Sequence, residues 1–287
     1  MSKPRVSFYK IVISGQIVES FQYAHPVGYQ LESSRKQNPY RKRRALHEQQ
    51  ITASSLSRTR NHLIRLINSN SRMWRNANEL IQPQFITYTF AENIQQLSEA
   101  NPLFTNYIKR LNYHYYNSKE SLARYVVVPE FQERGAVHYH VVFFNLQKIN
   151  QRQEFLKGDF ASVWEHGHIK IKKISHIPNV GRYMTKYMTK GATDRRLVGR
   201  KKYFSTRHLI KPVVISHDYL ASEMNDFLCT LKPIYAYITK PTEQNPLPKD
   251  NPTFCATYHL EPEQLHTLRS FYSLPEYESN TLLPKIL

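Results

Sequence analysis

Two histidines separated by a single residue are the sharpest chemical feature of the sequence. His138 and His140 lie in the segment VHYHVVFF at residues 137–144, whose composition predicts a β-strand. Residues two apart on a strand point to the same face, so the two imidazoles are expected side by side. If the preceding turn centres on Arg134, Glu130 lies opposite His138 across the hairpin and shares that face. Two histidines and one carboxylate suit a divalent metal ion with open coordination positions.

Two other interpretations of this segment stay open. The histidines can stand on a strand face without binding a metal, and Glu133 is a rival carboxylate. Glu133 falls in the predicted turn, whereas Glu130 falls on the strand before it. We therefore favour a metal site formed by His138, His140 and Glu130.

A repeated tetrapeptide, YMTKYMTK at residues 183–190, is the second feature. On a helix Tyr183 and Tyr187 share one face, about 6 Å apart along the axis, and Lys186 and Lys190 share the neighbouring face. A phenol is a poor nucleophile until a cation or a base assists it, and an adjacent lysine or a metal could do so. The alternative is a packed aromatic pair with solvated lysines, since aromatic residues at helical spacing are usually core residues.

The segments around these residues predict the elements that must position them. Strands are expected at residues 85–90, 124–128, 136–145 and 168–174. Helices are expected at residues 101–115, with Asn101 as cap and Pro102 in the first turn, and at residues 151–164. This order of elements is the split β-α-β, or ferredoxin-like, plan. The predicted class is α+β, with an antiparallel sheet of about five strands flanked by helices.

The flanking regions are less regular. A hairpin is expected around Gly15, a helix at residues 54–68, and a helix capped by Asn179 that ends near Gly191. Residues 241–252 are expected to be an exposed linker. We therefore expect an N-terminal extension with a basic arm and a helix (residues 1–75), a central domain (residues 76–211) and a C-terminal extension of unknown role (residues 212–287).

Composition indicates a polyanionic partner. The 287 residues include 40 Lys and Arg against 22 Asp and Glu, for a net charge of +18, and 20 tyrosines. Cations for phosphates and flat rings for unstacked bases suit nucleic acid, although a basic protein without a specific partner is the alternative. The candidate DNA-binding residues are Arg41, Lys42, Arg43, Arg44, Arg58, Arg60, Lys190, Arg200, Lys201 and Lys202.

Other classes of protein are disfavoured. Two cysteines exclude a disulfide framework and a cysteine-based zinc site, and favour a reduced intracellular setting. No apolar run approaches the roughly 20 residues that span a membrane, and the N-terminus lacks the pattern of a signal peptide. No Walker-type phosphate loop is present, so no ATP-driven motor is expected.

Together these features resemble the HUH endonuclease superfamily, named for its His-hydrophobic-His motif. Within it, the sequence is similar to the rolling-circle replication initiators (Rep) of the filamentous-phage and plasmid branch with two tyrosines. The resemblance spans roughly residues 55–212 and is carried by SLSRTRNHLIRLI, FITYTFAEN, YIKRLNY, VPEFQERGAVHYHVVFFN, VWEHGHIKI and NVGRYMTKYMTKG. The metal motif precedes the tyrosines, which argues against relaxases, and two tyrosines argue against most transposases. Tyr139 departs mildly from the aliphatic residue usual at the centre of the motif.

The resemblance implies the HUH endonuclease fold, and Mg²⁺ or Mn²⁺ held by His138, His140 and Glu130. Tyr183 and Tyr187 match the paired nucleophiles, and Lys186 is our candidate for stabilising the phosphate or the phenolate. A tyrosine would nick single-stranded or extruded origin DNA, leave a free 3′-OH and a 5′-phosphotyrosine, and later religate the strand without ATP. We favour Tyr187 as the indispensable tyrosine, while the sequence does not say which one attacks first.

The implied partners are origin DNA, a host helicase and a polymerase, in the cytoplasm of a bacterial host that carries the phage or plasmid. No membrane partner is expected, and the sequence gives no oligomeric state. Two other functions stay open. A metal-dependent DNA hydrolase would cleave without a covalent intermediate and tolerate Tyr→Phe changes, whereas a non-catalytic DNA-binding protein would bind without nicking.

Overall fold

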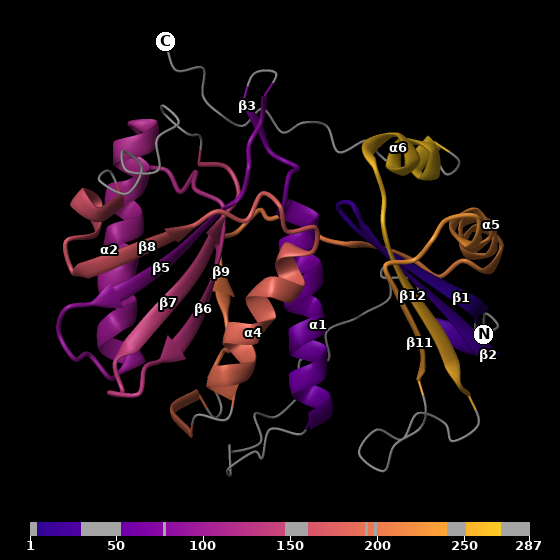
Figure 1. The fold of residues 1–287 in the computed structure, drawn as a ribbon, viewed down its shortest axis with the longest axis horizontal. Coiled ribbons are helices and arrows are strands. Elements are labelled where there is room, and N and C mark those ends of the chain that lie inside the picture. The colour runs from indigo at the N-terminus through magenta and orange to yellow at the C-terminus, as the bar shows by residue number, and fades with distance from the viewer. Residues whose placement is uncertain are drawn as a thin grey trace. The chain divides into compact units, whose positions relative to one another are not determined.

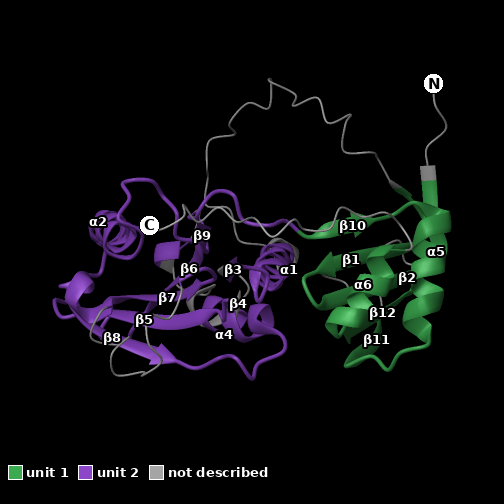
Figure 2. Cartoon of the chain, turned by 90° about the horizontal axis from the view of Figure 1, so that it is seen from above, with its two compact units in different colours: residues 1–55, 212–276 green, residues 56–211, 277–287 purple. Residues whose placement is uncertain are grey.

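The chain forms two compact units, each built on a five-stranded antiparallel sheet (Figure 2). The computed structural model describes residues 5–29, 53–76, 79–146, 160–192, 195–197, 200–239 and 251–270. Unit 1 comprises residues 1–55 and 212–276, and unit 2 is built from residues 56–211. The predicted α+β class is confirmed. The division differs from the expected one, because strands from the two terminal regions pair with each other in a single sheet.

Unit 1 contains the hairpin expected around Gly15, where a φ of +62° makes the tight turn between its strands. Its sheet has the order β10-β1-β2-β12-β11. The strands are β1 (Arg5–Ser14), β2 (Ile17–Tyr29), β10 (Val213–Ile215), β11 (Tyr235–Thr239) and β12 (Thr253–His259). Helices α5 (Asp218–Cys229) and α6 (Pro262–Ser270) bury an apolar core against this sheet (Figure 1). The expected linker at residues 241–252 lies almost entirely outside the described residues.

Unit 2 has the ferredoxin-like strand order that the sequence predicted. Its sheet has the order β8-β5-β7-β6-β9, with all neighbouring strands antiparallel. The strands are β5 (Gln84–Phe90), β6 (Tyr125–Phe131), β7 (Val137–Phe143), β8 (Gly167–Lys172) and β9 (Phe204–Ser205), and a separate two-stranded ribbon joins β3 (Arg75–Asn76) to β4 (Glu79–Leu80). The first four sheet strands in chain order therefore lie as 4-1-3-2, the split β-α-β arrangement, and β9 extends the sheet.

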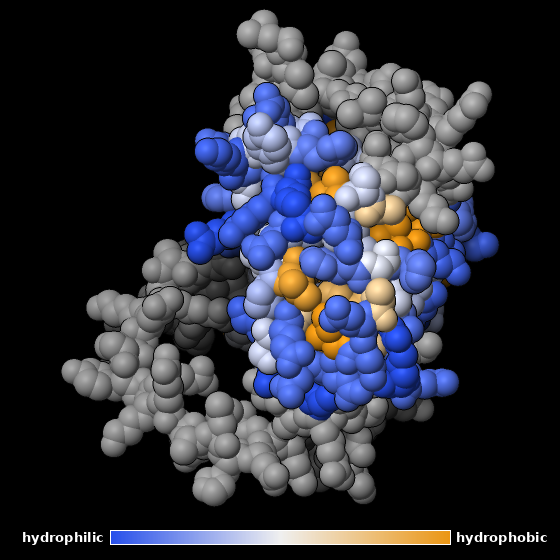
Figure 3. All heavy atoms as spheres, turned by 90° about the vertical axis from the view of Figure 1, so that its left-hand side faces the viewer, coloured by the Kyte–Doolittle hydropathy of each residue, from blue (hydrophilic) through white to orange (hydrophobic). Residues whose placement is uncertain are grey.

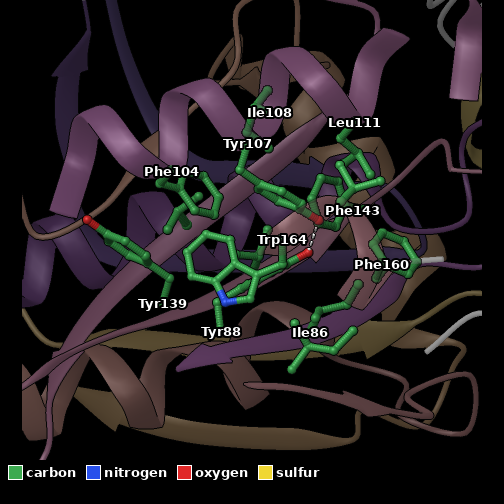
Figure 4. Close-up of a cluster of buried hydrophobic side chains, with 14 of the residues drawn as sticks. Ile86, Tyr88, Phe104, Tyr107, Ile108, Leu111, Tyr139, Phe143, Phe160 and Trp164 are labelled. Atoms are coloured by element: carbon green, nitrogen blue, oxygen red, sulfur yellow. Dashed lines mark hydrogen bonds between the residues drawn. The ribbon is translucent and has the colours of Figure 1, made fainter. Parts of the chain in front are cut away.

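Helices cover both faces of the unit 2 sheet. On one face α2 (Leu97–Tyr116) and the helical residues 160–164 pack an aromatic core around Tyr88, Tyr107 and Trp164 (Figure 4). The hydroxyl oxygens of Tyr88 and Tyr107 lie 2.5 Å apart, so these two buried polar groups satisfy each other. On the other face α1 (Ala53–Asn70) and α4 (Val180–Ala192) pack a separate apolar core. Successive side chains along each strand therefore point alternately into one core and the other.

Helix α2 begins four residues earlier than expected. It starts at Leu97, so Pro102 lies inside the helix and Asn101 is not its cap. Leu97 and Ala100 are buried and extend the apolar stripe of the helix, which outweighs the hydrogen bond that the proline cannot donate. Asn101 instead accepts a 2.6 Å hydrogen bond from the hydroxyl of Tyr139. The expected helix at residues 151–164 is described only from residue 160 onward.

Three further properties concern the surface, the helices and the cysteines of the described residues. Figure 3, which faces the unit 2 side of Figure 1, shows a mainly hydrophilic surface with a few hydrophobic areas. Among the described helices, none is both long and apolar enough to cross a membrane. Cys229 and Cys255 are thiols that take part in no disulfide.

A close backbone contact fixes α4 against α1. A Cβ atom on Gly181 would lie 2.3 Å from the carbonyl oxygen of Ile64, so only glycine fits there. The side chain of Asn68 joins the two helices, because its Oδ1 accepts a 2.8 Å bond from the amide of Gly181 and its Nδ2 donates to Asn179 Oδ1 at 2.9 Å. Asn179 Oδ1 also accepts the amide of Arg182 at 2.8 Å, which confirms the predicted cap of α4.

Replacing Gly181 by alanine should therefore destabilise the protein. The added methyl group must push α4 away from α1, and such overpacking costs about 1–3 kcal/mol. Chemical denaturation measures the change in the free energy of unfolding. Lys173→Ala, at an exposed position after β8, is the control and should change it by less than about 0.5 kcal/mol. Equal stability of Gly181→Ala and the unmodified protein would contradict the close contact.

Candidate active site

Strand β7 places both histidines on the sheet face that α1 and α4 cover. The register confirms the expected pairing, because Glu130 lies directly opposite His138. On the other side of β7, Thr89 lies opposite His138 and Thr87 lies opposite His140. Tyr139 points to the opposite face and packs in the α2 core, so its ring does not disturb the histidine pair.

Both ring nitrogens of His140 are held. The imidazole is only 4% exposed. Thr87 Oγ1 lies 3.1 Å from its Nδ1, and Glu130 Oε2 lies 2.5 Å from its Nε2. The contact of Nδ1 with Thr87 is of the kind that orients histidine metal ligands, whereas a metal ion at Nε2 would have to replace the contact with Glu130.

His138 is in the opposite situation. Its Nε2 is buried and has no hydrogen-bond partner among the described residues. Burial first, and then His140 and Arg134, lower the pKa of His138 to about 4, against the raising effect of Glu130. The imidazole is therefore neutral at pH 7, the form that binds metal ions. A buried nitrogen without a partner costs about 1–3 kcal/mol, which a bound ligand can offset.

The side chains of His138, His140 and Glu130 have the donor atoms that suit a divalent cation, but they do not all converge on one point. Imidazole nitrogens and a carboxylate are suitable donors, and the unpartnered Nε2 of His138 is available. Within the described ranges, however, no three His, Cys, Asp or Glu side chains gather around one point. Glu130 contacts His140, while the rings of His138 and His140 lie 6.2 Å apart.

Helix α4 brings both tyrosines onto this part of the sheet. The ring of Tyr187 stacks on His140 with centroids 3.9 Å apart and lies 5.5 Å from Phe85. Tyr183 meets Phe85 edge-on at 5.5 Å. The two hydroxyl oxygens lie 3.2 Å apart. The two motifs that the sequence singled out, 43 to 49 residues apart in the chain, therefore form one constellation.

Two lysines lie beside Tyr183. Lys186 Nζ is 4.0 Å from the centroid of the Tyr183 ring and 4.8 Å from that of Tyr187. Lys172 Nζ, from β8, is 5.1 Å from the Tyr183 ring. Lys172 was not among the predicted site residues, although the alternation of isoleucine and lysine in its strand was the available signal.

The two phenols differ in acidity. Burial raises the pKa of Tyr183, but hydrogen bonds from Tyr187 and Lys172 and the charge of Lys186 outweigh it, so this pKa lies below the ordinary value for tyrosine. The pKa of Tyr187 is raised, first by burial, then by Tyr183 and by the charge of Glu130. Tyr183 is consequently the easier of the two to deprotonate.

The candidate DNA-binding residues have mixed outcomes. Arg41, Lys42, Arg43 and Arg44 lie outside the described residues, as does the side chain of Lys190. Four others are exposed in unit 2, namely Arg58, Arg60, Arg200 and Lys201.

Lys202 differs from the four exposed members of the expected DNA-binding set. It is only 8% exposed, and its ammonium donates a 2.9 Å hydrogen bond to the carbonyl of Leu197. The ammonium is thus already bonded within the protein, and DNA binding by Lys202 stays a prediction.

Comparison with known proteins points to replication. Residues 83–192 match the sequence model of the family described as replication-associated protein ORF2/gene 2 protein. This segment lies within unit 2 and contains the histidine pair, Glu130 and both tyrosines. The match covers 110 of the 287 residues and relates this part of the chain to replication-associated proteins. No curated protein and no solved structure matches the chain significantly.

The pKa of His138 predicts a pH dependence of stability. Below pH 6.5 the unfolded chain protonates this imidazole, whereas the folded protein leaves it neutral down to about pH 4. Protonation therefore favours the unfolded state across this window, and stability should fall as the pH falls through it. Urea midpoints measured between pH 7 and pH 4 should drop less for His138→Gln than for the unmodified protein. The exposed His114→Gln serves as control, and identical pH profiles for all three proteins would contradict the prediction.

Proposed function

We propose that this protein is a rolling-circle replication initiator of the two-tyrosine HUH type. It nicks single-stranded origin DNA through a tyrosine nucleophile, keeps the 5′ end as a phosphotyrosine and later religates the strand. The observation that carries the proposal is that Tyr187 stacks on His140 at 3.9 Å while its hydroxyl lies 3.2 Å from that of Tyr183. The match of residues 83–192 to a replication-associated family supports it.

Tyr183 makes the first attack in this proposal. Lys172 and Lys186 stabilise its phenolate, because both ammonium groups lie within about 5 Å of its ring. The phenolate oxygen forms a bond to phosphorus while the bond to the 3′-oxygen breaks, and that oxygen takes up a proton to become a free 3′-OH. The phosphotyrosine retains the energy of the cleaved bond, so later attack by a 3′-OH restores the DNA and releases the phenol without ATP.

Tyr187 serves as the second nucleophile. The sequence alone favoured it as the indispensable tyrosine, but its ring lies over His140 and its pKa is raised. It becomes competent when Tyr183 carries the DNA end, because the hydroxyls lie 3.2 Å apart and a second strand can reach both. In this proposal Tyr183 therefore acts first and Tyr187 second.

His138, His140 and Glu130 are the residues that would hold Mg²⁺ or Mn²⁺. When bound, such an ion neutralises the negative charge that develops on the scissile phosphate. Thr87 fixes the ring of His140 through its Nδ1, and the unpartnered Nε2 of His138 supplies a second donor. Within the chain, Lys186 acts on the same charge from the helix side.

A covalent-adduct assay tests the proposal. The protein is incubated with Mn²⁺ and labelled single-stranded DNA from its own replicon, and the products are separated on a denaturing gel. We expect a labelled band at the mass of the protein that is lost with EDTA and in His138→Ala/His140→Ala. Tyr183→Phe should lose the first adduct, whereas Tyr187→Phe should form it and fail in strand transfer.

The same assay separates the rival functions. Nicking without an adduct that survives in Tyr183→Phe/Tyr187→Phe would establish a water-activating hydrolase instead. Binding without any nicking of the cognate origin would indicate a DNA-binding protein without this activity. Adduct formation by Tyr183→Phe at the unmodified rate would overturn the proposed order of the tyrosines.

Lys186, which lies beside the rings of Tyr183 and Tyr187, should affect the rate of adduct formation more than the affinity for DNA. Lys186→Gln removes a cation that stabilises developing negative charge, and loss of one such group costs about 10²-fold in rate. Single-turnover adduct formation measures this loss. Lys109→Gln, on the exposed side of α2, is the matched control and should react at the unmodified rate. A Lys186→Gln rate within about twofold of the control would exclude this role.

A further inference from the structure

Strand β8 carries a row of exposed polar side chains that the proposed reaction does not use in full. His168, Lys170 and Lys172 alternate with Ile169 and Ile171, which pack against the aromatic core. The three polar residues are exposed and point to the face that carries α4. Burial of the isoleucines requires only polar residues at the alternate positions, so it does not explain why they are cationic or basic.

The register aligns this row with the candidate active site. His168 pairs with Thr89, which pairs with His138 on its other side. Lys170 is joined in the same way through Thr87 to His140. The row therefore runs along the outer edge of the sheet, beside the two histidines and on their face.

Lysines on edge strands often serve only to prevent unwanted strand pairing. Two observations favour a ligand in this case. Lys172 Nζ lies 5.1 Å from the ring of Tyr183, so the end of the row reaches the nucleophile. Strands β8, β5 and β7 and helix α4 contain no Asp or Glu, so no carboxylate on these elements neutralises the row.

We propose that His168, Lys170 and Lys172 form a phosphate-binding row that holds the backbone of the scissile single strand and leads it to Tyr183. Successive members of the row are about 6.8 Å apart along the strand, so each can meet a different phosphate of an extended DNA strand. Lys172 contacts the phosphate nearest the tyrosine, and Lys170 contacts the next one. His168 donates a hydrogen bond to a third phosphate. The inference rests on the proposed function for the identity of the strand.

Salt-dependent binding tests the row separately from cleavage. The protein carries Tyr183→Phe/Tyr187→Phe and is kept in EDTA, so that no reaction can occur. Its affinity for single-stranded oligothymidylate of about 16 nucleotides is measured over a range of salt concentrations. Each phosphate contact contributes about 0.7 to the slope of log affinity against log salt. Lys170→Ala/Lys172→Ala should therefore reduce the slope by about 1.4 and weaken binding.

A charge-matched control removes two lysines outside the row. Lys109→Ala/Lys173→Ala loses the same charge from the exposed side of α2 and from the residue after β8, and should leave the slope unchanged. Lys170→Gln/Lys172→Gln, which keeps polar side chains on the strand, should repeat the loss with an unchanged melting temperature.

The outcomes distinguish the row from the reaction. An unchanged slope in both double variants of the row, or an equal decrease in the control, would overturn the phosphate-binding row even if the adduct forms. A reduced slope confined to the row variants supports the row, and does so even if the adduct assay fails and overturns the tyrosine mechanism.

Discussion

The backbone contact at Gly181 determines where α4 lies, and the candidate site depends on that position. The backbone of Ile64 lies too close to residue 181 for any side chain there, and Asn68 is hydrogen-bonded to both Gly181 and Asn179. These contacts define the position of α4 against α1. In this position the buried Met184 and Met188 lie in the core, Tyr183 contacts Phe85, and Tyr187 stacks on His140. A small displacement of this helix would remove the stacking on His140, because aromatic contacts fall off within a few ångströms.

The identical tetrapeptides of α4 acquire different chemistry from tertiary structure alone. Tyr183 lies beside Lys172 of the edge strand β8. Tyr187 lies over the buried imidazole of His140, which is bonded to Glu130. One environment favours the phenolate and the other favours the phenol. A local repeat therefore need not produce two equivalent side chains, and this inequality suits the proposed use of the two tyrosines in sequence.

Much of unit 2 could be predicted from the sequence, because its signals are local. Alternating strands, the turn at Gly135 and the cap at Asn179 yield the strand order and the pairing of Glu130 with His138. The start of α2 could not be predicted, since burial of Leu97 overrides the break that Pro102 suggests. The burial of Lys202 likewise depends on a carbonyl that only the folded loop presents. The sheet of unit 1 could not be predicted, because the pairing of β2 with β12 joins segments more than 200 residues apart and leaves no local pattern in the sequence.

The discontinuity of unit 1 has a consequence for biosynthesis. Strands β1 and β2 are synthesised before residues 56–211, whereas β10, β11 and β12 of the same sheet are synthesised after them. Domains generally fold as they are synthesised, so unit 2 can complete its own sheet while the first hairpin still lacks its neighbours. The exposed edges of that hairpin must be kept from pairing with other chains during this interval. The order of synthesis therefore allows the candidate site to form before unit 1 is complete.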